Sequence, residues 1–276
     1  MRITFWVRSS NDCHSSDLGT PSSSSAQSSA CRARARRSQG AALDLRRSRV
    51  RRFVTVSIPV RTLESILLDH GSVLLIDASS SPLHGGWLVQ GETARWATVD
   101  QEAGTGLYLL LAELDISPNQ AGAFLFCEGP GSMLGIRTVA AALRVWCALQ
   151  ARPVYRYLSL DLLAHAQGGP GRTFICDARR RSWHALTIDE GGAFSPIRRL
   201  ATQELPAGEV YMPEGFRSWT QLPTPAPKRI PYDPALLSHK LAQVPCFQLT
   251  EDPDAYQPER PAYAKWTPQV HQAPPA

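Results

Sequence analysis

The sequence lacks the features that mark membrane, secreted and metal-centred proteins. No run approaches the roughly 18 consecutive apolar residues that a transmembrane helix needs, and no secretory signal is recognisable. The six cysteines form no CxxC pair, none lies beside a histidine at metal-ligand spacing, and no two histidines are four residues apart. We therefore expect a cytoplasmic protein with reduced thiols, no membrane association and no metal centre of its own.

Generic enzyme motifs are also missing from the glycine-rich stretch "CEGPGSMLGIRTVAAALRVW", residues 127–146. A Walker loop ends in Lys followed by Ser or Thr, and no lysine follows these glycines. A serine elbow needs Gly-x-Ser-x-Gly and a dinucleotide fingerprint needs Gly-x-Gly-x-x-Gly, whereas the spacing here is Gly-x-Gly-x-x-x-Gly. These absences predict that the chain carries no catalytic residues.

The charge that is present is placed very unevenly. Residues 1–56 hold eleven arginines and three aspartates, a formal charge of +8, so the rest of the chain must carry −3 to give the total of +5. This Ser- and Arg-rich segment has no periodic apolar positions, and we expect it to be disordered. An organelle transit peptide and a nucleic-acid-binding arm are alternatives, but we favour a translation start assigned too far upstream.

Beyond this segment, the apolar pattern predicts an α/β protein with two lobes. Short apolar runs that indicate buried strands are "SVLLIDASS", "HGGWLVQ", "ARWATVD", "AGAFLFC", "RTFICD" and "GEVYMPEG". Each lobe opens on a strand that ends in aspartate, Asp77 in one and Asp177 in the other. We predict a first lobe over residues 57–168, a smaller and Pro-rich second lobe over 169–249, and a C-terminal tail over 250–276.

Two helices are predicted on either side of the strand "AGAFLFC". The first, at residues 104–115, has leucines spaced i, i+3, i+4 and i+7 that form one apolar face. These leucines are Leu107, Leu110, Leu111 and Leu114. The second, at 132–149, contains three consecutive alanines, which leave a thin surface suited to close helix packing. From the pattern alone, either face could pack inside the chain or against a partner.

The glycines before the second helix have the means to bind an anion. Gly129 and Gly131 permit positive φ and close backbone approach, and Ser132 is a good N-cap. Free N–H groups and the positive end of the helix dipole would meet there. We interpret the stretch mainly as a turn that sets the entry of the helix. Weaker candidates for nucleotide or anion binding are these three residues with Asp77 and Asp177.

The order of these motifs resembles the TsaB family, also called YeaZ. The most specific piece, "GPGSMLGIR", matches the family's GPGS-F-T-G-[VI]-R pattern except at Met133 and Leu134, and "DAR" at residues 177–179 is the second match. The resemblance covers roughly residues 72–268 and implies a two-lobed, actin-like ATPase (ribonuclease H-like) fold with a degenerate second lobe. Because Met133 and Leu134 remove the loop's hydroxyl, we expect no nucleotide to be bound by this chain alone.

The resemblance also implies a function. Members of this family are partners rather than catalysts. They support TsaD, a related metal-carrying subunit that transfers a threonylcarbamoyl group to adenosine 37 of tRNAs reading ANN codons, and TsaE, an ATPase, joins the assembly. We therefore expect a non-catalytic subunit with TsaD-like and TsaE-like partners, indirect contact with tRNA, and homodimers in isolation. ATP or ADP and a divalent metal would belong to the partner complex.

The same resemblance implies where the partner binds. In this family, two helices of the first lobe pack against the equivalent helices of TsaD, so the two helices predicted above are expected to form the interface. The candidate interface residues are Leu107, Leu110, Leu111, Leu114, Met133, Ile136, Arg137, Ala140, Ala141 and Arg144.

Two other functions are left open by the residues. One is an independent small-molecule kinase of the same fold that holds Mg-ATP between Asp77 and Asp177. The other is an M22-type peptidase homologue, although the chain lacks the His-x-x-x-His pair that would hold a catalytic metal.

Overall fold

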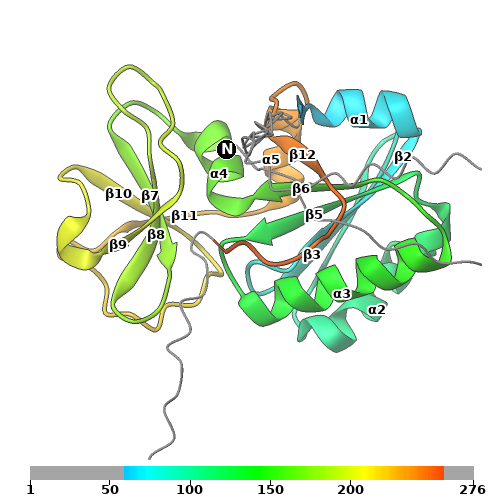
Figure 1. Ribbon diagram of the computed structural model, residues 1–276, viewed down its shortest axis with the longest axis horizontal. Coiled ribbons are helices and arrows are strands. Elements are labelled where there is room, and N and C mark those ends of the chain that lie inside the picture. Colours follow the sequence, from blue (N-terminus) through cyan, green and yellow to red (C-terminus); the bar gives the residue numbers. More distant parts are fainter. Residues whose placement is uncertain (1–58, 258–276) are drawn as a thin grey trace, which may run out of the picture. The chain divides into compact units, whose positions relative to one another are not determined.

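The computed structural model describes residues 59–257, which form a seven-stranded and a five-stranded sheet (Figure 1). The predictions for residues 1–56 and for the tail beyond residue 257 fall outside the described residues. The first sheet, in spatial order, consists of β1 (Val60–Arg61), β12 (Phe247–Thr250), β6 (Val154–Leu158), β5 (Ala123–Gly129), β2 (Ser72–Asp77), β3 (Leu83–Val89) and β4 (Arg95–Val99).

The first sheet begins with an antiparallel meander and continues with parallel strands. β2, β3 and β4 pair antiparallel, β5 then lies parallel to β2, and β6 lies parallel to β5. Helix α2 (Ala103–Glu113), followed by the short 3-10 helix η1 (Pro118–Gln120), connects β4 to β5, and α3 (Met133–Leu149) connects β5 to β6. Both helices lie within two residues of their predicted bounds.

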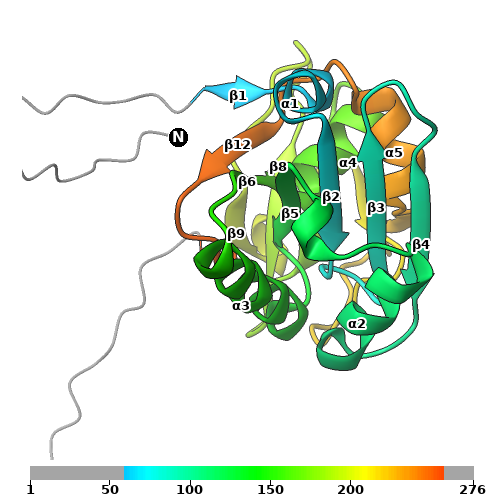
Figure 2. The ribbon, with the colours of Figure 1, turned by 90° about the vertical axis from the view of Figure 1, so that its right-hand side faces the viewer.

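Helices cover both faces of this sheet, which explains the unbroken apolar runs of its central strands. Along β2, Leu74 and Ile76 pack in the cluster that includes α2 and α3, whereas Val73 and Leu75 pack in the cluster on the other face. That other face is covered by α1 (Leu63–His70), α4 (Ser159–Gln167) and α5 (Pro234–Leu241). Figures 1 and 2 show α2 and α3 side by side on one side of the sheet and α1 and α5 on the opposite side.

The second sheet repeats the strand order of the first. Its spatial order is β11 (Lys228–Ile230), β10 (Glu209–Pro213), β7 (Arg172–Asp177), β8 (Ser182–Thr187) and β9 (Arg198–Ala201). As in the first sheet, three antiparallel strands are followed by two parallel ones, with β7 in the place of β2. Asp77 and Asp177 therefore end equivalent strands.

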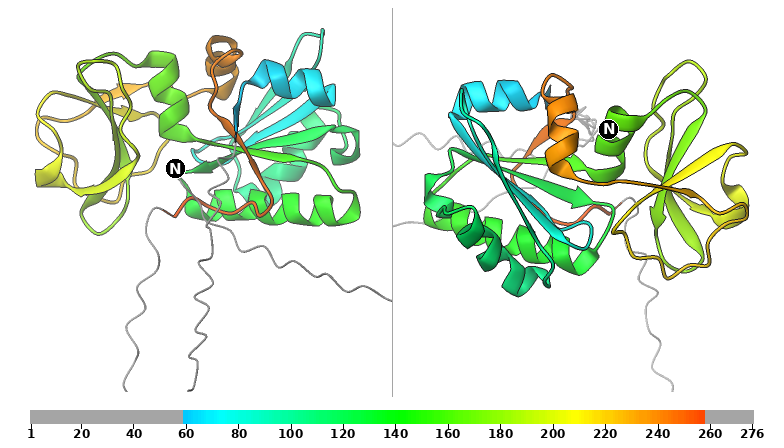
Figure 3. Two further views of the ribbon diagram at one scale, coloured as in Figure 1. Left: turned by 45° about the horizontal axis from the view of Figure 1, so that its top comes forward. Right: turned by 180° about the vertical axis from the view of Figure 1, so that it is seen from behind.

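The second lobe lacks the connecting α-helices of the first. Only the 3-10 helix η2 (Thr202–Glu204) lies between β9 and β10, and a Pro-rich segment without a helix joins β10 to β11. No α-helix occurs in the chain between β7 and β11, whose strands are shown in Figure 3. The repeated strand order and the missing helices confirm the predicted two-lobed, actin-like (ribonuclease H-like) fold with a degenerate second lobe.

The chain returns to the first lobe after β11, which corrects one predicted boundary. Residues 169–249 were assigned to the second lobe, yet β12 pairs antiparallel with β6 in the first sheet, and β1 pairs with β12. The physical reason is that β6 would otherwise leave a row of unpaired backbone groups at the sheet edge. Helix α5, also within that predicted range, packs against α4.

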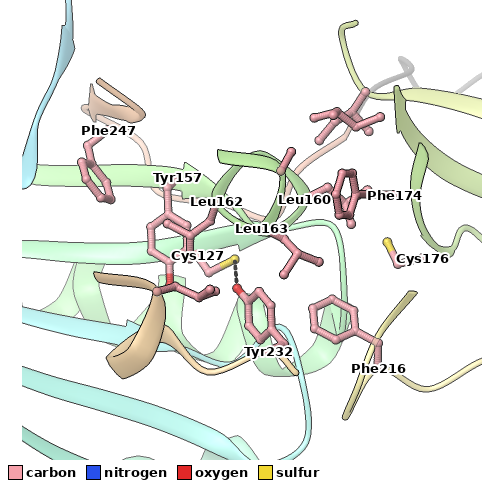
Figure 4. Packing of buried hydrophobic residues seen from close by; sticks show 14 of the residues in the cluster. Cys127, Tyr157, Leu160, Leu162, Leu163, Phe174, Cys176, Phe216, Tyr232 and Phe247 are labelled. Carbon is pink, nitrogen blue, oxygen red and sulfur yellow. Dashed lines mark hydrogen bonds between the residues drawn. The ribbon is translucent and has the colours of Figure 1, made fainter. Parts of the chain in front are cut away.

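Helix α4 joins the cores of the two lobes. It contacts strands β5 and β6 of the first sheet and β7 and β8 of the second. Its buried residues Leu160 and Leu163 belong to one hydrophobic cluster that includes Tyr157 from the first lobe and Phe174 from the second (Figure 4). The two sheets are therefore stabilised by a common hydrophobic core.

Candidate functional site

Asp77 ends β2 in a closed polar cluster that leaves its side chain with no exposed surface. One carboxylate oxygen, Oδ1, accepts hydrogen bonds from the backbone N–H of Ser79 at 2.8 Å and from its hydroxyl at 2.6 Å. The other, Oδ2, accepts from the hydroxyls of Tyr157 and Tyr232, each at 2.6 Å. Each oxygen thus accepts two hydrogen bonds from the protein, which leaves neither oxygen directed at a metal ion.

The two tyrosines that bond Asp77 come from distant parts of the chain. Tyr157 lies in β6, and Tyr232 follows β11, 155 residues after Asp77 in the sequence. Burial and then the negative charge of Asp77 raise the pKa of both phenols well above the ordinary value, so both remain protonated donors. Burial, followed by Asp77, likewise raises the pKa of the Cys127 thiol, whose Sγ lies 4.0 Å from the Tyr232 hydroxyl (Figure 4). The cluster therefore ties the returning segment to the first sheet.

The glycine loop packs directly on the turn that follows Asp77. Gly129 has a φ of +113°, in the region that favours glycine. A Cβ on Gly131 would lie 2.3 Å from the carbonyl oxygen of Ser79, so no side chain fits there. The backbone N–H of Ser132 donates to the same carbonyl at 2.8 Å. The backbone of the glycine loop thus packs closely against the turn after β2 and not against a ligand. The loop acts as the tight turn that sets the start and direction of α3.

Ser132 occupies the N-cap position of α3, as predicted, but its side chain makes no capping hydrogen bond. A Cβ on Gly135 would meet the carbonyl oxygen of Ala78 at 2.6 Å, which shows how tightly the first turn of α3 is pressed against the end of β2. The Ser159 hydroxyl donates to the carbonyl oxygen of Pro130 at 2.6 Å and holds the loop from the side of α4.

Asp177 ends β7 and is also engaged by protein donors. Its carboxylate accepts the backbone N–H groups of Arg179, Trp219 and Thr220, the last at 2.7 Å. Burial alone would raise the pKa of Asp177, but hydrogen bonds from the backbone of Thr220, Arg179 and Trp219 outweigh it and hold the pKa below its ordinary value. The ionised side chain therefore links the β7–β8 turn to the loop that contains Trp219.

The described residues offer no other group for metal chemistry. Within residues 59–257, no set of three or more His, Cys, Asp or Glu side chains could hold a metal ion. Asp77 and Asp177, which a kinase would need around Mg-ATP, are each occupied by a separate hydrogen-bond network.

None of the helices within residues 59–257 has the length and apolar character needed to cross a membrane.

The predicted interface residues divide into two groups, and this corrects the sequence analysis. Four residues are exposed: Met133, Arg137, Ala141 and Arg144. Six are buried in the core between the helices and the sheet: Leu107, Leu110, Leu111, Leu114, Ile136 and Ala140. The leucine repeat of α2 is its inner face, because the sheet face beneath it needs an apolar cover. These six residues are therefore unable to contact a partner in this structure.

Arg144 is engaged within the chain. Its guanidinium forms an ion pair with Asp252, with an Nη2–Oδ1 distance of 3.0 Å, and approaches Asp254 at 4.0 Å. These contacts hold the first part of the predicted tail against α3.

Further apolar residues of the same two helices are exposed and were not among the predicted interface residues: Tyr108, Leu109, Leu134, Val145 and Leu149. Leu134 and Leu149 are 76% and 79% exposed at the two ends of α3. We call the exposed apolar set the outer helical face: Tyr108, Leu109, Met133, Leu134, Ala141, Val145 and Leu149. On α3, successive members of this set are 7, 4 and 4 residues apart, which places them on one side of the helix: Leu134, Ala141, Val145 and Leu149. This second periodicity, offset from the core-facing one, was the available signal.

Two solved structures from Pseudomonas aeruginosa are similar to this chain. One, described as an uncharacterized protein with similarity to peptidase YEAZ, is 18% identical with a TM-score of 0.42, covering 61% of this chain and 89% of that chain. The other, YeaZ, is 20% identical with a TM-score of 0.44, covering 61% of this chain and 90% of that chain. No protein-family model and no curated protein matches the chain.

Proposed function

We propose that the chain is a non-catalytic subunit that supports a TsaD-like enzyme in threonylcarbamoylation of adenosine 37 in tRNAs reading ANN codons. A TsaE-like ATPase would join the same assembly in the cytoplasm. The proposal draws on the motifs "GPGSMLGIR" and "DAR" of the sequence. The observation that carries it in the structure is the outer helical face on α2 and α3, an apolar surface on two adjoining helices of the first lobe.

The closed state of the two aspartates supports a non-catalytic role. A carboxylate that organises metal and phosphate needs oxygens directed at the ligand, whereas both oxygens of Asp77 are saturated by Ser79 and two tyrosines. Opening that cluster would break buried hydrogen bonds to a charged group, each worth about 1.5–3 kcal/mol. The chain is therefore better suited to hold a shape than to bind Mg-ATP.

The outer helical face supports docking of another helical surface. Two adjoining helices present ridges and grooves into which a second pair of helices can pack. Large exposed apolar side chains such as Tyr108 and Leu134 are the kind that become anchors when an interface forms around them. Ala141 lies between Leu134 and Val145 on the same face and leaves room for close approach. A TsaD-like partner would cover this face in the complex, and a second copy of the chain would cover it in isolation.

A binding experiment with matched variants tests the proposal. Leu134→Asp and Val145→Asp place charges on the outer helical face, while Leu236→Asp changes a leucine of α5 that is 64% exposed elsewhere. Isothermal titration with a purified TsaD-like protein should show at least a tenfold loss of affinity for the first two variants and wild-type affinity for the third. Wild-type chain that shows no binding at micromolar concentration, or equal loss in all three variants, would refute the proposal.

Ala141→Trp is a second, steric probe of the same face. Ala141 is exposed, so the added bulk should weaken association while leaving unfolding by urea unchanged. Ala142 packs against the core and is a poorer choice, because a tryptophan there would also disturb folding.

The kinase alternative is tested separately by calorimetry of the isolated chain with Mg-ATP. Tight binding there would favour an independent enzyme over the proposed subunit.

A further inference from the structure

The second lobe presents a tryptophan to solvent beside a cluster of arginines. Trp219 is 69% exposed, although tryptophan side chains usually bury a large apolar area in the core or in an interface. The guanidinium carbon of Arg179 lies 5.4 Å from the centroid of its indole ring, a cation–π arrangement. This surface belongs to the β7–β8 turn and the loop after β10, and it is separate from the outer helical face on α2 and α3.

Asp177 holds this surface in place. Because its carboxylate bonds the backbone N–H groups of Arg179, Trp219 and Thr220, it fixes two loops that are about 40 residues apart in the sequence. Its hydrogen bonds to Arg179 and Trp219 use their backbone N–H groups, so these two side chains remain exposed. Asp177, a candidate ligand of a nucleotide in the sequence analysis, is thus a positioning residue for these side chains.

The β7–β8 turn contains three consecutive arginines with positive φ. Arg179, Arg180 and Arg181 have φ of 61°, 52° and 58°, and all three side chains are exposed. Glycine or asparagine would adopt this conformation at lower cost, so the turn geometry does not account for the choice of arginine. Within residues 59–257, none of these three side chains forms an ion pair with a carboxylate. Their charge is therefore available to a ligand.

Further arginines add to the same region. Arg217 is exposed two residues before Trp219, and Arg199 donates to the carbonyl oxygens of Ala178 and Arg179 at 3.2 Å each. Apart from Asp177, the acidic residue of these loops is Glu214, at the start of the loop after β10. The local charge is thus positive, in contrast to the formal −3 of the chain beyond residue 56.

We propose that Arg179, Arg180, Arg181, Arg217 and Trp219, the arginine–tryptophan surface, bind a single-stranded segment of nucleic acid. An unpaired base stacks on the exposed indole, and the guanidinium groups bind the phosphates on either side. The surface contains arginine and no lysine, which suits planar, bidentate recognition of phosphate and stacking on bases. A duplex would satisfy the arginines but leaves no free base for Trp219. This inference is independent of the TsaD-like partner, since it concerns direct contact through the other lobe.

Fluorescence anisotropy with labelled 12-nucleotide single strands of RNA and DNA tests the proposal on the full chain. Trp219→Ala should weaken binding about tenfold, as expected for loss of one stacked base, and Trp219→Phe should retain most of it. Arg180→Gly and Arg181→Gly keep the positive-φ turn, and each should weaken binding a few-fold and lower the salt slope by about one. Lys240→Ala, a charge-matched change on α5, should leave binding unchanged. The arginines of residues 1–56 are common to all variants, so only differences between variants report on this surface.

Three outcomes would overturn the proposal. Trp219→Ala could bind single strands as tightly as wild type, which would place any binding outside this surface. A duplex of the same sequence could bind equally well with the same dependence on Trp219, which would exclude base stacking. Phosphatidylserine vesicles or an acidic peptide could be bound in a Trp219-dependent way while the oligonucleotides are not, which would assign the surface to a different ligand.

Discussion

The hydroxyl of Tyr232 should stabilise the fold through Asp77, and its removal gives a sharp test of the closed cluster. Tyr232→Phe deletes one of the two phenol donors on Oδ2, at 2.6 Å, and leaves a fully buried carboxylate with three hydrogen bonds. A hydrogen bond to a charged acceptor contributes about 1.5–3 kcal/mol, and the deleted oxygen leaves little new cavity. We expect the free energy of unfolding to fall by about 2 kcal/mol.

Urea unfolding followed by far-ultraviolet circular dichroism measures this loss. The midpoint should fall with an unchanged m value, because the surface exposed on unfolding is the same. For a folded region of about 200 residues, 2 kcal/mol corresponds to a lower Tm by roughly 4–8 °C. Tyr211→Phe is the matched control, since its hydroxyl bonds the exposed Glu209 and its removal should leave the midpoint unchanged. Equal midpoints for the two variants would show that the cluster does not hold the returning segment.

The partner phenol extends the test. Tyr157→Phe should cost a similar amount, and the double variant should cost more than the sum, because Oδ2 would then have no donor while remaining buried. Strict additivity would show that the two hydroxyls act independently of the shared carboxylate.

Two further predictions concern the glycine loop and a buried acid. Gly131→Ala should lower stability by about 2 kcal/mol or more, since its Cβ would meet the Ser79 carbonyl at 2.3 Å, whereas Gly104→Ala, with open space around it, should raise stability by about 0.5–1 kcal/mol in urea unfolding. Burial raises the pKa of Asp161 from 3.8 to about 6. The native state therefore retains a proton that the unfolded chain releases, so the contribution of Asp161 to stability should fall as the pH rises from about 4 to about 6. Asp161→Asn should remove this contribution and be more stable than wild type by about 3 kcal/mol at pH 7.5, with little difference at pH 4; a parallel pH profile for both proteins would contradict the reasoning.

The first lobe could be predicted from local patterns. Its central strands are unbroken apolar runs, α2 has a leucine repeat, and the glycines end β5 before α3 begins. These are one-dimensional signals of burial, length and backbone freedom, so they specify where elements start and stop. The position of Asp77 and Asp177 at the ends of strands followed from the same signals.

The roles of the site residues could not be read in this way. Tyr232 carries no motif, and its bond to Asp77 exists only because the chain returns from β11 to the first sheet. Whether Leu110 or Leu134 faces a partner depends on which side of α2 and α3 meets the sheet, and both helices have apolar residues on more than one side. The exposed Trp219 becomes meaningful only beside Arg179, to which Asp177 joins it.

Local sequence was thus sufficient for the central strands of both lobes, for α2 and α3, and for the glycine turn, since each depends on neighbours along the chain. Tertiary structure alone decided that both aspartates are saturated by protein donors, that the leucines of α2 are internal, and that β12 completes the first sheet. These features arise from contacts between residues tens to more than a hundred positions apart. Burial and hydrogen bonding at such contacts are properties of the folded chain, because they depend on which surfaces it brings together.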